Sequence, residues 1–147
     1  MSLITDKVFY NALKSSSELL EAVGNRIENT SIPVPDEELP NEPVPYIIIT
    51  FDGLQNEGLT KDNSYEGDTD KVTVSIEVAA PDRETLGDIT DLIRQTVIAY
   101  FEDTTSHAVD DYDLVPVSYE FSAGPIQYDS MKPCFFQTLS YGCVTNP

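Results

Sequence analysis

The chain has 147 residues, of which 26 are acidic and 8 basic, and its formal net charge is −18. This length suits one globular unit with a buried core, so we expect a single domain over residues 1–147. The acidic excess argues against binding to nucleic acid or to anionic membranes, because both depend on Lys and Arg. No stretch reaches the roughly 18–20 apolar residues that a membrane-spanning helix needs.

The first predicted elements are two short helices. Thr5 or Asp6 can cap the first one, and Ser15 with Glu18 matches a capping box for the second. Gly24 is typical of a helix C-terminus, and an extended segment is expected from Ile27. Both helices carry apolar residues at helical spacing. These residues are Val8, Phe9, Ala12, Leu13, Leu19, Leu20 and Val23.

A proline-rich acidic segment follows and leads into an apolar run. Five prolines in residues 28–45 exclude a helix or a central strand and predict a long surface connection. Residues 46–51 are predicted to form a strand buried on both faces. Asp52 and Gly53 are expected to end it, and residues 53–70 to form a second long acidic loop.

The second half of the chain predicts a strand, a helix and two further strands. Residues 72–78 alternate between apolar and polar, which indicates a half-buried strand. A long amphipathic helix is predicted from Arg83 to Phe101, with Asp82 as its cap, Arg94 facing outward and an acidic loop over 102–113 after it. Two strands are predicted around residues 115–121 and 133–144. The apolar helix positions are Leu86, Ile89, Ile93, Val97 and Tyr100.

The resulting order, α-β-β-α-β-β, predicts the α+β class. We expect one mostly antiparallel, four-stranded sheet with the helices packed on one face. Pro116 suggests an edge position or a bulge for the strand at 115–121, and Gly124 with Pro125 is expected to turn the chain after it.

The charge is unevenly distributed along the chain. Residues 28–70 hold eleven acidic side chains against one basic, and residues 102–130 hold seven against none. Both stretches consist largely of predicted loops. The pattern therefore predicts near-neutral helices and strands joined by acidic connections.

Two acidic groups are candidates for metal or acid–base chemistry. Asp62, Ser64, Glu66 and Asp68 place oxygen ligands at alternate positions, but the twelfth position of a calcium loop is Thr73 and not the bidentate Glu. The second group has no recognisable His, Lys or Tyr partner. We therefore expect solvated loops, no bound metal, no cofactor and no catalytic residue. The second group consists of Asp110, Asp111 and Asp113.

The remaining reactive residues give no catalytic pattern. His107 is the only histidine and is interpreted as a surface residue. Cys134 and Cys143 lie nine residues apart in one predicted strand, which points them to opposite faces about 30 Å apart and excludes a disulfide between them. Three tyrosines, Tyr65, Tyr112 and Tyr128, lie in predicted loops or turns, where aromatic side chains are useful at protein interfaces.

The arrangement resembles a known family. The segment Leu20 to Ile27, which contains a Val-Gly-Asn-Arg-Ile turn, precedes the proline-rich loop, and Pro45-Tyr46 then opens the first long strand. The strand at 72–78 leads into the helix that begins at Arg83. This order over residues 5–145 is similar to the tail completion proteins of long-tailed bacteriophages, which include tail-to-head joining proteins and the lambda tail terminator.

The resemblance implies a non-enzymatic virion protein at the neck or tail end, made in the cytoplasm of a bacterial host. It implies a ring of copies, commonly a hexamer, that contacts tail-tube and head-connector proteins. DNA passes through the bore without being specifically bound, and no membrane is involved. The acidic residues expected at the lumen or at an interface are Glu57, Asp62, Glu66, Asp68, Asp110, Asp111 and Asp113.

Two alternatives from other functional classes remain at this point. An acidic protein can mimic DNA and inhibit a nucleic-acid-binding protein, which needs carboxylates spaced like phosphates on one surface. A divalent-metal-binding module could instead use residues 62–68 or 110–113.

Overall fold

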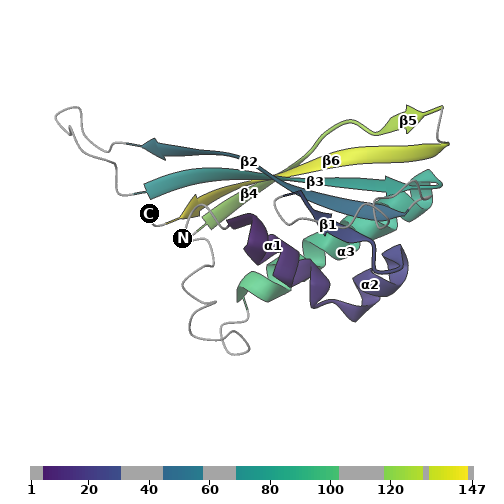
Figure 1. Ribbon diagram of the computed structural model, residues 1–147, viewed down its shortest axis with the longest axis horizontal. Coiled ribbons are helices and arrows are strands. Elements are labelled where there is room, and N and C mark those ends of the chain that lie inside the picture. The colour runs from purple at the N-terminus through teal and green to yellow at the C-terminus, as the bar shows by residue number, and fades with distance from the viewer. Residues whose placement is uncertain (1–4, 31–44, 58–68, 103–117, 131–132, 146–147) are drawn as a thin grey trace.

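The computed structural model describes residues 5–30, 45–57, 69–102, 118–130 and 133–145, and these residues form an α+β structure as predicted (Figure 1). The elements, in chain order, are α1 (Thr5–Lys14), α2 (Ser17–Val23), β1 (Ile27–Asn29), β2 (Tyr46–Glu57), β3 (Thr69–Ala80), α3 (Arg83–Glu102), β4 (Ser118–Ala123), β5 (Gln127–Asp129) and β6 (Cys134–Thr145).

The six strands form one mixed sheet in the order β1-β2-β3-β6-β4, with β5 also paired to β6. β1 runs parallel to β2, and every other described pairing is antiparallel. The prediction of four strands in the order α-β-β-α-β-β is therefore wrong. It missed the three-residue strands β1 and β5, which are too short to show a periodic pattern.

The predicted turn at Gly124 and Pro125 does not reverse the chain, because the strands before and after it run in the same direction along β6. These two residues separate β4 from β5, and both strands pair with β6 in sequence along one edge. The Gly124 N–H donates to the Thr138 carbonyl at 2.9 Å, and Gln137 Nε2 donates to the Gly124 carbonyl at 2.7 Å. These two hydrogen bonds hold the segment between β4 and β5 against β6. The predicted edge position of this region is confirmed.

β2 is longer and less buried than predicted. It continues past Asp52, which forms a bulge between Phe51 and Gly53, and pairs with β3 as far as Glu57. The polar residues after the bulge stay extended because β3 supplies backbone partners, which hydrophobic patterning does not reveal. Ile47 and Ile49 are buried but Ile48 is only half-buried, so β2 is not enclosed on both faces.

The helix caps agree with the sequence in two places and differ in one. Ser16, and not Ser15, caps α2, since its Oγ accepts a hydrogen bond from the Leu19 N–H at 3.2 Å. The C-terminal Gly24 is left-handed, with φ at 59°. At α3, Asp82 Oδ1 accepts from the Thr85 N–H at 2.7 Å, which fixes the predicted start of that helix.

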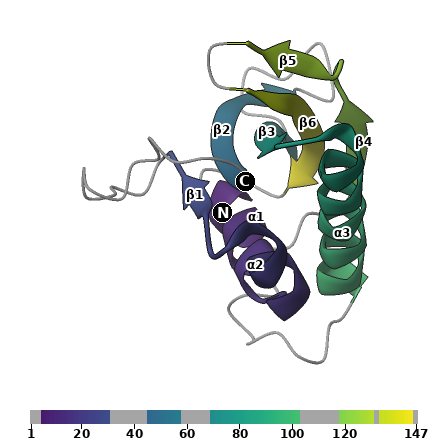
Figure 2. The same ribbon diagram turned by 90° about the vertical axis from the view of Figure 1, so that its right-hand side faces the viewer.

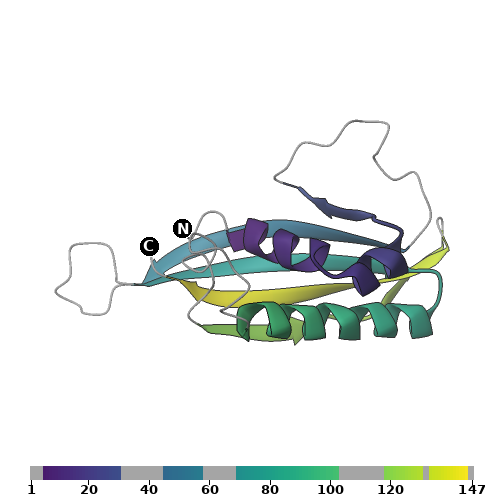
Figure 3. The same ribbon diagram turned by 90° about the horizontal axis from the view of Figure 1, so that it is seen from below.

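All three helices pack on one face of the sheet, as expected (Figures 2 and 3). We call this the helix-covered face. Alternation along β3 sends one set of side chains into the core beneath α1 and α3. That set consists of Val72, Val74, Ile76, Val78 and Ala80, all fully buried.

Aromatic side chains close one end of this core. The Phe9 ring lies 4.9 Å from the Tyr141 ring and 5.3 Å from the Phe101 ring, measured between centroids. Tyr141 in turn contacts Tyr119 and Phe121 from β4. The cluster therefore joins α1 and α3 to β6 and to the edge strand.

Candidate functional site

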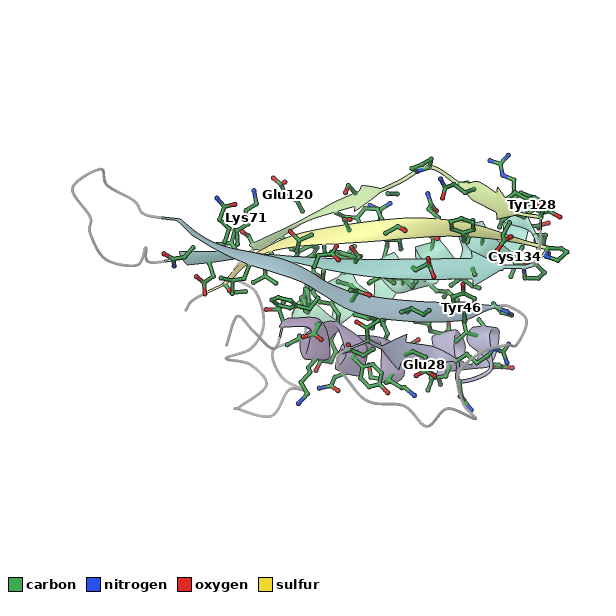
Figure 4. All side chains as sticks on the ribbon, turned by 45° about the horizontal axis from the view of Figure 1, so that its top comes forward. Glu28, Tyr46, Lys71, Glu120, Tyr128 and Cys134 are labelled. Atoms are coloured by element: carbon green, nitrogen blue, oxygen red, sulfur yellow. The ribbon has the colours of Figure 1, made fainter. Side chains whose placement is uncertain are left out.

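None of the described helices covers the face of the sheet opposite α1, α2 and α3 (Figures 2 and 3). We call it the open face (Figure 4). Strand alternation and register assign its side chains, many of which are small hydroxyl residues. The main ones are Tyr46, Ile48, Thr50, Thr73, Ser75, Glu77, Ser118, Glu120, Ser122, Phe136, Thr138, Ser140 and Val144.

The middle of the open face is polar and half-exposed. Ser75 on β3 lies between Thr50 on β2 and Ser140 on β6 in the register of the sheet. Its hydroxyl donates to the carboxylate of Asp52, the bulge residue of β2. Asp52 is exposed, so the bulge turns a carboxylate onto the open face.

A tyrosine and a glutamate face each other near one end of the open face. The Tyr46 hydroxyl donates to Glu77 Oε2 at 3.3 Å. Partial burial, with a smaller contribution from the nearby Glu77 charge, raises the pKa of Tyr46 to about 12. At neutral pH the phenol therefore stays protonated and remains a hydrogen-bond donor.

Charged residues also mark the opposite end of the open face. Lys71 and Glu120 are both exposed there, whereas Tyr46 and Cys134 lie at the other end (Figure 4). Asp52, Glu77 and Glu120 outnumber Lys71 among the described side chains of this face. The surface is thus polar and mildly acidic.

The two cysteines lie on opposite faces of β6, as predicted, and both are free thiols. Both are also buried. Cys143 belongs to the core, where burial raises the pKa of its thiol to about 12. A thiol with such a pKa is almost entirely protonated at neutral pH, so Cys143 is poorly suited to act as a nucleophile.

Most of the acidic residues that the sequence singled out lie outside the described residues. Among the predicted lumen or interface residues, only Glu57 falls inside them, where it ends β2 and is not in a loop. His107, Tyr65 and Tyr112 also lie outside, whereas Tyr128 is exposed on β5. The others outside the described ranges are Asp62, Ser64, Glu66, Asp68, Asp110, Asp111 and Asp113.

The acidic stretches are not confined to loops, which corrects the sequence interpretation. Seven of their acidic residues occupy helices or strands. Those with described side chains are exposed or half-buried except Asp70, which is buried and accepts a hydrogen bond from Asn56 Nδ2 at 2.8 Å. These seven are Glu28, Asp52, Glu57, Asp70, Glu102, Glu120 and Asp129.

The described residues contain neither a cluster of metal-binding side chains nor a membrane-spanning helix. Within them, no three His, Cys, Asp or Glu side chains converge on a point where they could hold a metal ion. None of the described helices combines the length and the apolar character needed to cross a membrane.

Comparison with known proteins gives a match at the level of structure alone. Neither the protein-family models nor the curated sequences produce a match. Among solved structures, the chain is similar to a chain of the virion of the native gene transfer agent particle, with a TM-score of 0.58 and 13% identity. The alignment covers 97% of this chain and 94% of that chain. The two chains therefore share a fold over nearly their whole lengths.

The open face is the part of this site that sequence reasoning left unassigned. The alternation of Thr73, Ser75 and Glu77 with buried residues predicted one exposed side of a strand. The hydroxyls of β2, β4 and β6 could not be added to it, because the order and register of the strands were unknown.

Proposed function

We propose that the protein is a non-enzymatic structural component of a phage-like particle. The observation that carries the proposal is the near full-length similarity in fold to a chain of a gene transfer agent virion. Coverage of both chains is high, so the comparison involves a whole chain and not a single shared motif.

Within such a particle, we propose a tail completion role at the neck or tail end. The Val-Gly-Asn-Arg-Ile turn and the Pro45-Tyr46 start of β2 support this assignment through the family resemblance. The ring, commonly a hexamer, would contact tail-tube and head-connector proteins and surround the path of DNA.

The charge of the chain is compatible with this role. A net charge of −18 opposes adhesion to DNA phosphates. A passage through which DNA slides requires such weak adhesion. The open face carries hydroxyl and carboxylate groups, and Lys71 is the basic residue among its described side chains. Such a surface is expected to bind DNA only weakly.

Electron microscopy of particles that carry a gold-labelled copy of the chain tests the proposal. We expect label at the neck or the tail end. Label elsewhere on the particle would contradict the tail completion role, and unlabelled particles would contradict a virion role altogether. Recovery of a DNA-binding protein by the unlabelled chain would support the DNA-mimic alternative.

A further inference from the structure

The strand β4 forms one edge of the sheet. Among the described strands it pairs with β6 alone, and the strand at the other end of the sheet, β1, has only three residues. β4 has six residues and contains neither the Lys nor the Pro that commonly protects an edge strand. Its outer side therefore presents backbone donors and acceptors that a further strand can bind.

The hydrogen bonds between β4 and β6 identify the backbone groups that face outward. The Gly124 N–H donates to the Thr138 carbonyl at 2.9 Å, so Gly124 occupies a hydrogen-bonded position of the antiparallel pair. Because such positions alternate along a strand, the residues between them direct their N–H and C=O groups away from β6. These outward residues are Tyr119, Phe121 and Ala123.

Apolar side chains line the helix-covered side of this edge. Helix α3 runs beneath β4 (Figures 2 and 3), and its Phe101 ring lies 5.3 Å from the Tyr119 ring. The Arg94 guanidinium carbon lies 4.4 Å from the centre of the Phe121 ring. Between these two positions of α3, Ile98 is 42% exposed. An apolar side chain of an added strand can therefore be covered by Phe121 and Ile98.

The other side of the edge is polar and acidic. Glu120 and the serines on either side of Phe121 and Tyr119 are exposed on the open face. Burial, followed by the charge of Glu102, raises the pKa of Tyr119, which places a second carboxylate near the strand. Arg94 is the basic side chain that the described residues place beside this edge, and its guanidinium lies over an aromatic ring. Basic residues of a partner would complement the two carboxylates.

The chain itself contains no segment of the complementary kind. A strand added to β4 needs apolar residues at alternate positions, on the side of Ile98, and basic residues between them, on the side of Glu120. The two closest basic residues of the chain, Lys7 and Lys14, are seven positions apart. No stretch of the sequence therefore alternates basic with apolar residues, so a second copy is not the complementary partner.

We propose that β4 binds an extended segment of a different protein as an additional antiparallel strand of the sheet. The segment carries apolar residues on the side of α3 and Lys or Arg on the open face. Main-chain hydrogen bonds supply the affinity of such a pairing, and the alternate side chains supply its specificity. The pairing is a property of the chain and does not require a place in a phage-like particle.

A synthetic peptide with the sequence Thr-Val-Lys-Val-Lys-Val-Thr tests the pairing. In the antiparallel arrangement its three valines lie opposite Tyr119, Phe121 and Ala123, and their N–H groups face β4. Methylation of the three valine nitrogens removes these donors. Methylation of the two lysine nitrogens removes only N–H groups that point away from β4, so this peptide is the matched control with the same charge.

NMR titration and amide hydrogen exchange of the whole chain measure the result. In the free chain, the amides of Phe121 and Ala123 should exchange faster than those of Glu120 and Ser122, which bond to β6. Saturating peptide should protect the first two and leave the other two unchanged. We expect methylation at the valines to weaken binding at least about tenfold, and methylation at the lysines to weaken it less than about twofold.

An exchange of charges tests the contribution of Glu120. Glu120→Lys should weaken binding of the lysine peptide about threefold or more, and should strengthen binding of the peptide Thr-Val-Glu-Val-Glu-Val-Thr by a similar factor. Asp88→Lys is the matched control, because Asp88 is exposed on α3 before the residues that contact β4. It makes the same change in net charge and should leave the preference between the two peptides unchanged.

Other results would overturn the proposal. Protection of the Phe121 and Ala123 amides in the free chain would show that the edge is already paired. Equal weakening by the two methylated peptides would indicate binding through charge alone, and weakening only by methylation at the lysines would indicate a parallel strand. Absence of shift changes in β4 at millimolar peptide would exclude the site. None of these results depends on where the chain lies in a particle, so the proposed function stands or falls separately.

Discussion

The two faces of the sheet differ in what holds them in place. On the helix-covered face, side chains of β3 and β6 are fully buried against three helices. On the open face, their immediate neighbours in sequence are half-exposed hydroxyl and charged residues. Because side chains alternate between the faces, one strand can supply a rigid core and, at adjacent positions, a surface whose chemistry is free to vary.

A pair of adjacent residues in β6 tests this difference most directly. Leu139 is fully buried and Thr138 is exposed on the open face. Leu139→Ala should lower the free energy of unfolding by about 2–5 kcal/mol, whereas Thr138→Ala should change it by about 0.5 kcal/mol or less. Urea unfolding measures both. Equal losses of unfolding free energy in the two variants would contradict the view that the helix-covered face, and not the open face, stabilises the fold.

Alkaline pH should weaken the helix-covered face through Cys143. The raised pKa means that the folded chain keeps a proton that the unfolded chain has lost above about pH 9. Stability should therefore fall as pH rises from about 9 towards 12, by at most about 1.4 kcal/mol per pH unit from this thiol. Cys143→Ala should show a shallower slope in urea unfolding at several pH values. An unchanged slope would show that the thiol is not protected by burial.

Tyr46 on the open face should add to the alkaline loss at higher pH. Its pKa of about 12 exceeds the ordinary value of 10.0, so its stabilising effect is present below pH 10 and declines above it. Tyr46→Phe should reduce the slope in that range only. The comparison with Cys143→Ala then separates the contributions of the two faces.

The cap of α2 tests how much the helix layer depends on local bonds. Ser16→Ala removes the acceptor for the Leu19 N–H and should cost about 1 kcal/mol. Ser17→Ala, one residue later and exposed, should be close to neutral. Thermal unfolding of the two variants distinguishes the cap. Similar losses in both would indicate that the serines act through helix propensity alone.

The smallest expected effect concerns the contact between α3 and the sheet edge. Arg94 lies over the Phe121 ring and is exposed, so Arg94→Gln should cost about 0.5–1 kcal/mol. Gln95→Ala is a control on the same turn. A double-mutant cycle with Phe121→Leu measures the coupling, and additivity of the two changes would contradict a direct interaction.

Elements with strong periodicity were predictable from the sequence, and short or polar ones were not. The helix from Arg83, the alternating strand at residues 72–78 and the final strand all have side chains whose spacing reports their surroundings. β1 and β5 have three residues each, and the end of β2 is polar, so their strand structure depends on partners far away in sequence. The capping-box pattern favoured Ser15, and only the backbone geometry shows that Ser16 is the cap.

The candidate site was less predictable than the fold. The candidate residues that the sequence suggested belong mostly to acidic segments outside the described ranges. The open face escaped notice because its members come from several strands that only register brings together. The bulge at Asp52, which aims a carboxylate at Ser75, also depends on pairing with β3.

By itself, the sequence determined the α+β class, the amphipathic elements, the acidic net charge and the free thiols, since composition and local spacing are enough for each. Only the tertiary structure decided the order of the strands, the parallel pairing of β1 with β2 and the shared open face. These features depend on hydrogen bonds between segments distant in the chain, and local side-chain patterns carry no information about which strand will lie beside which.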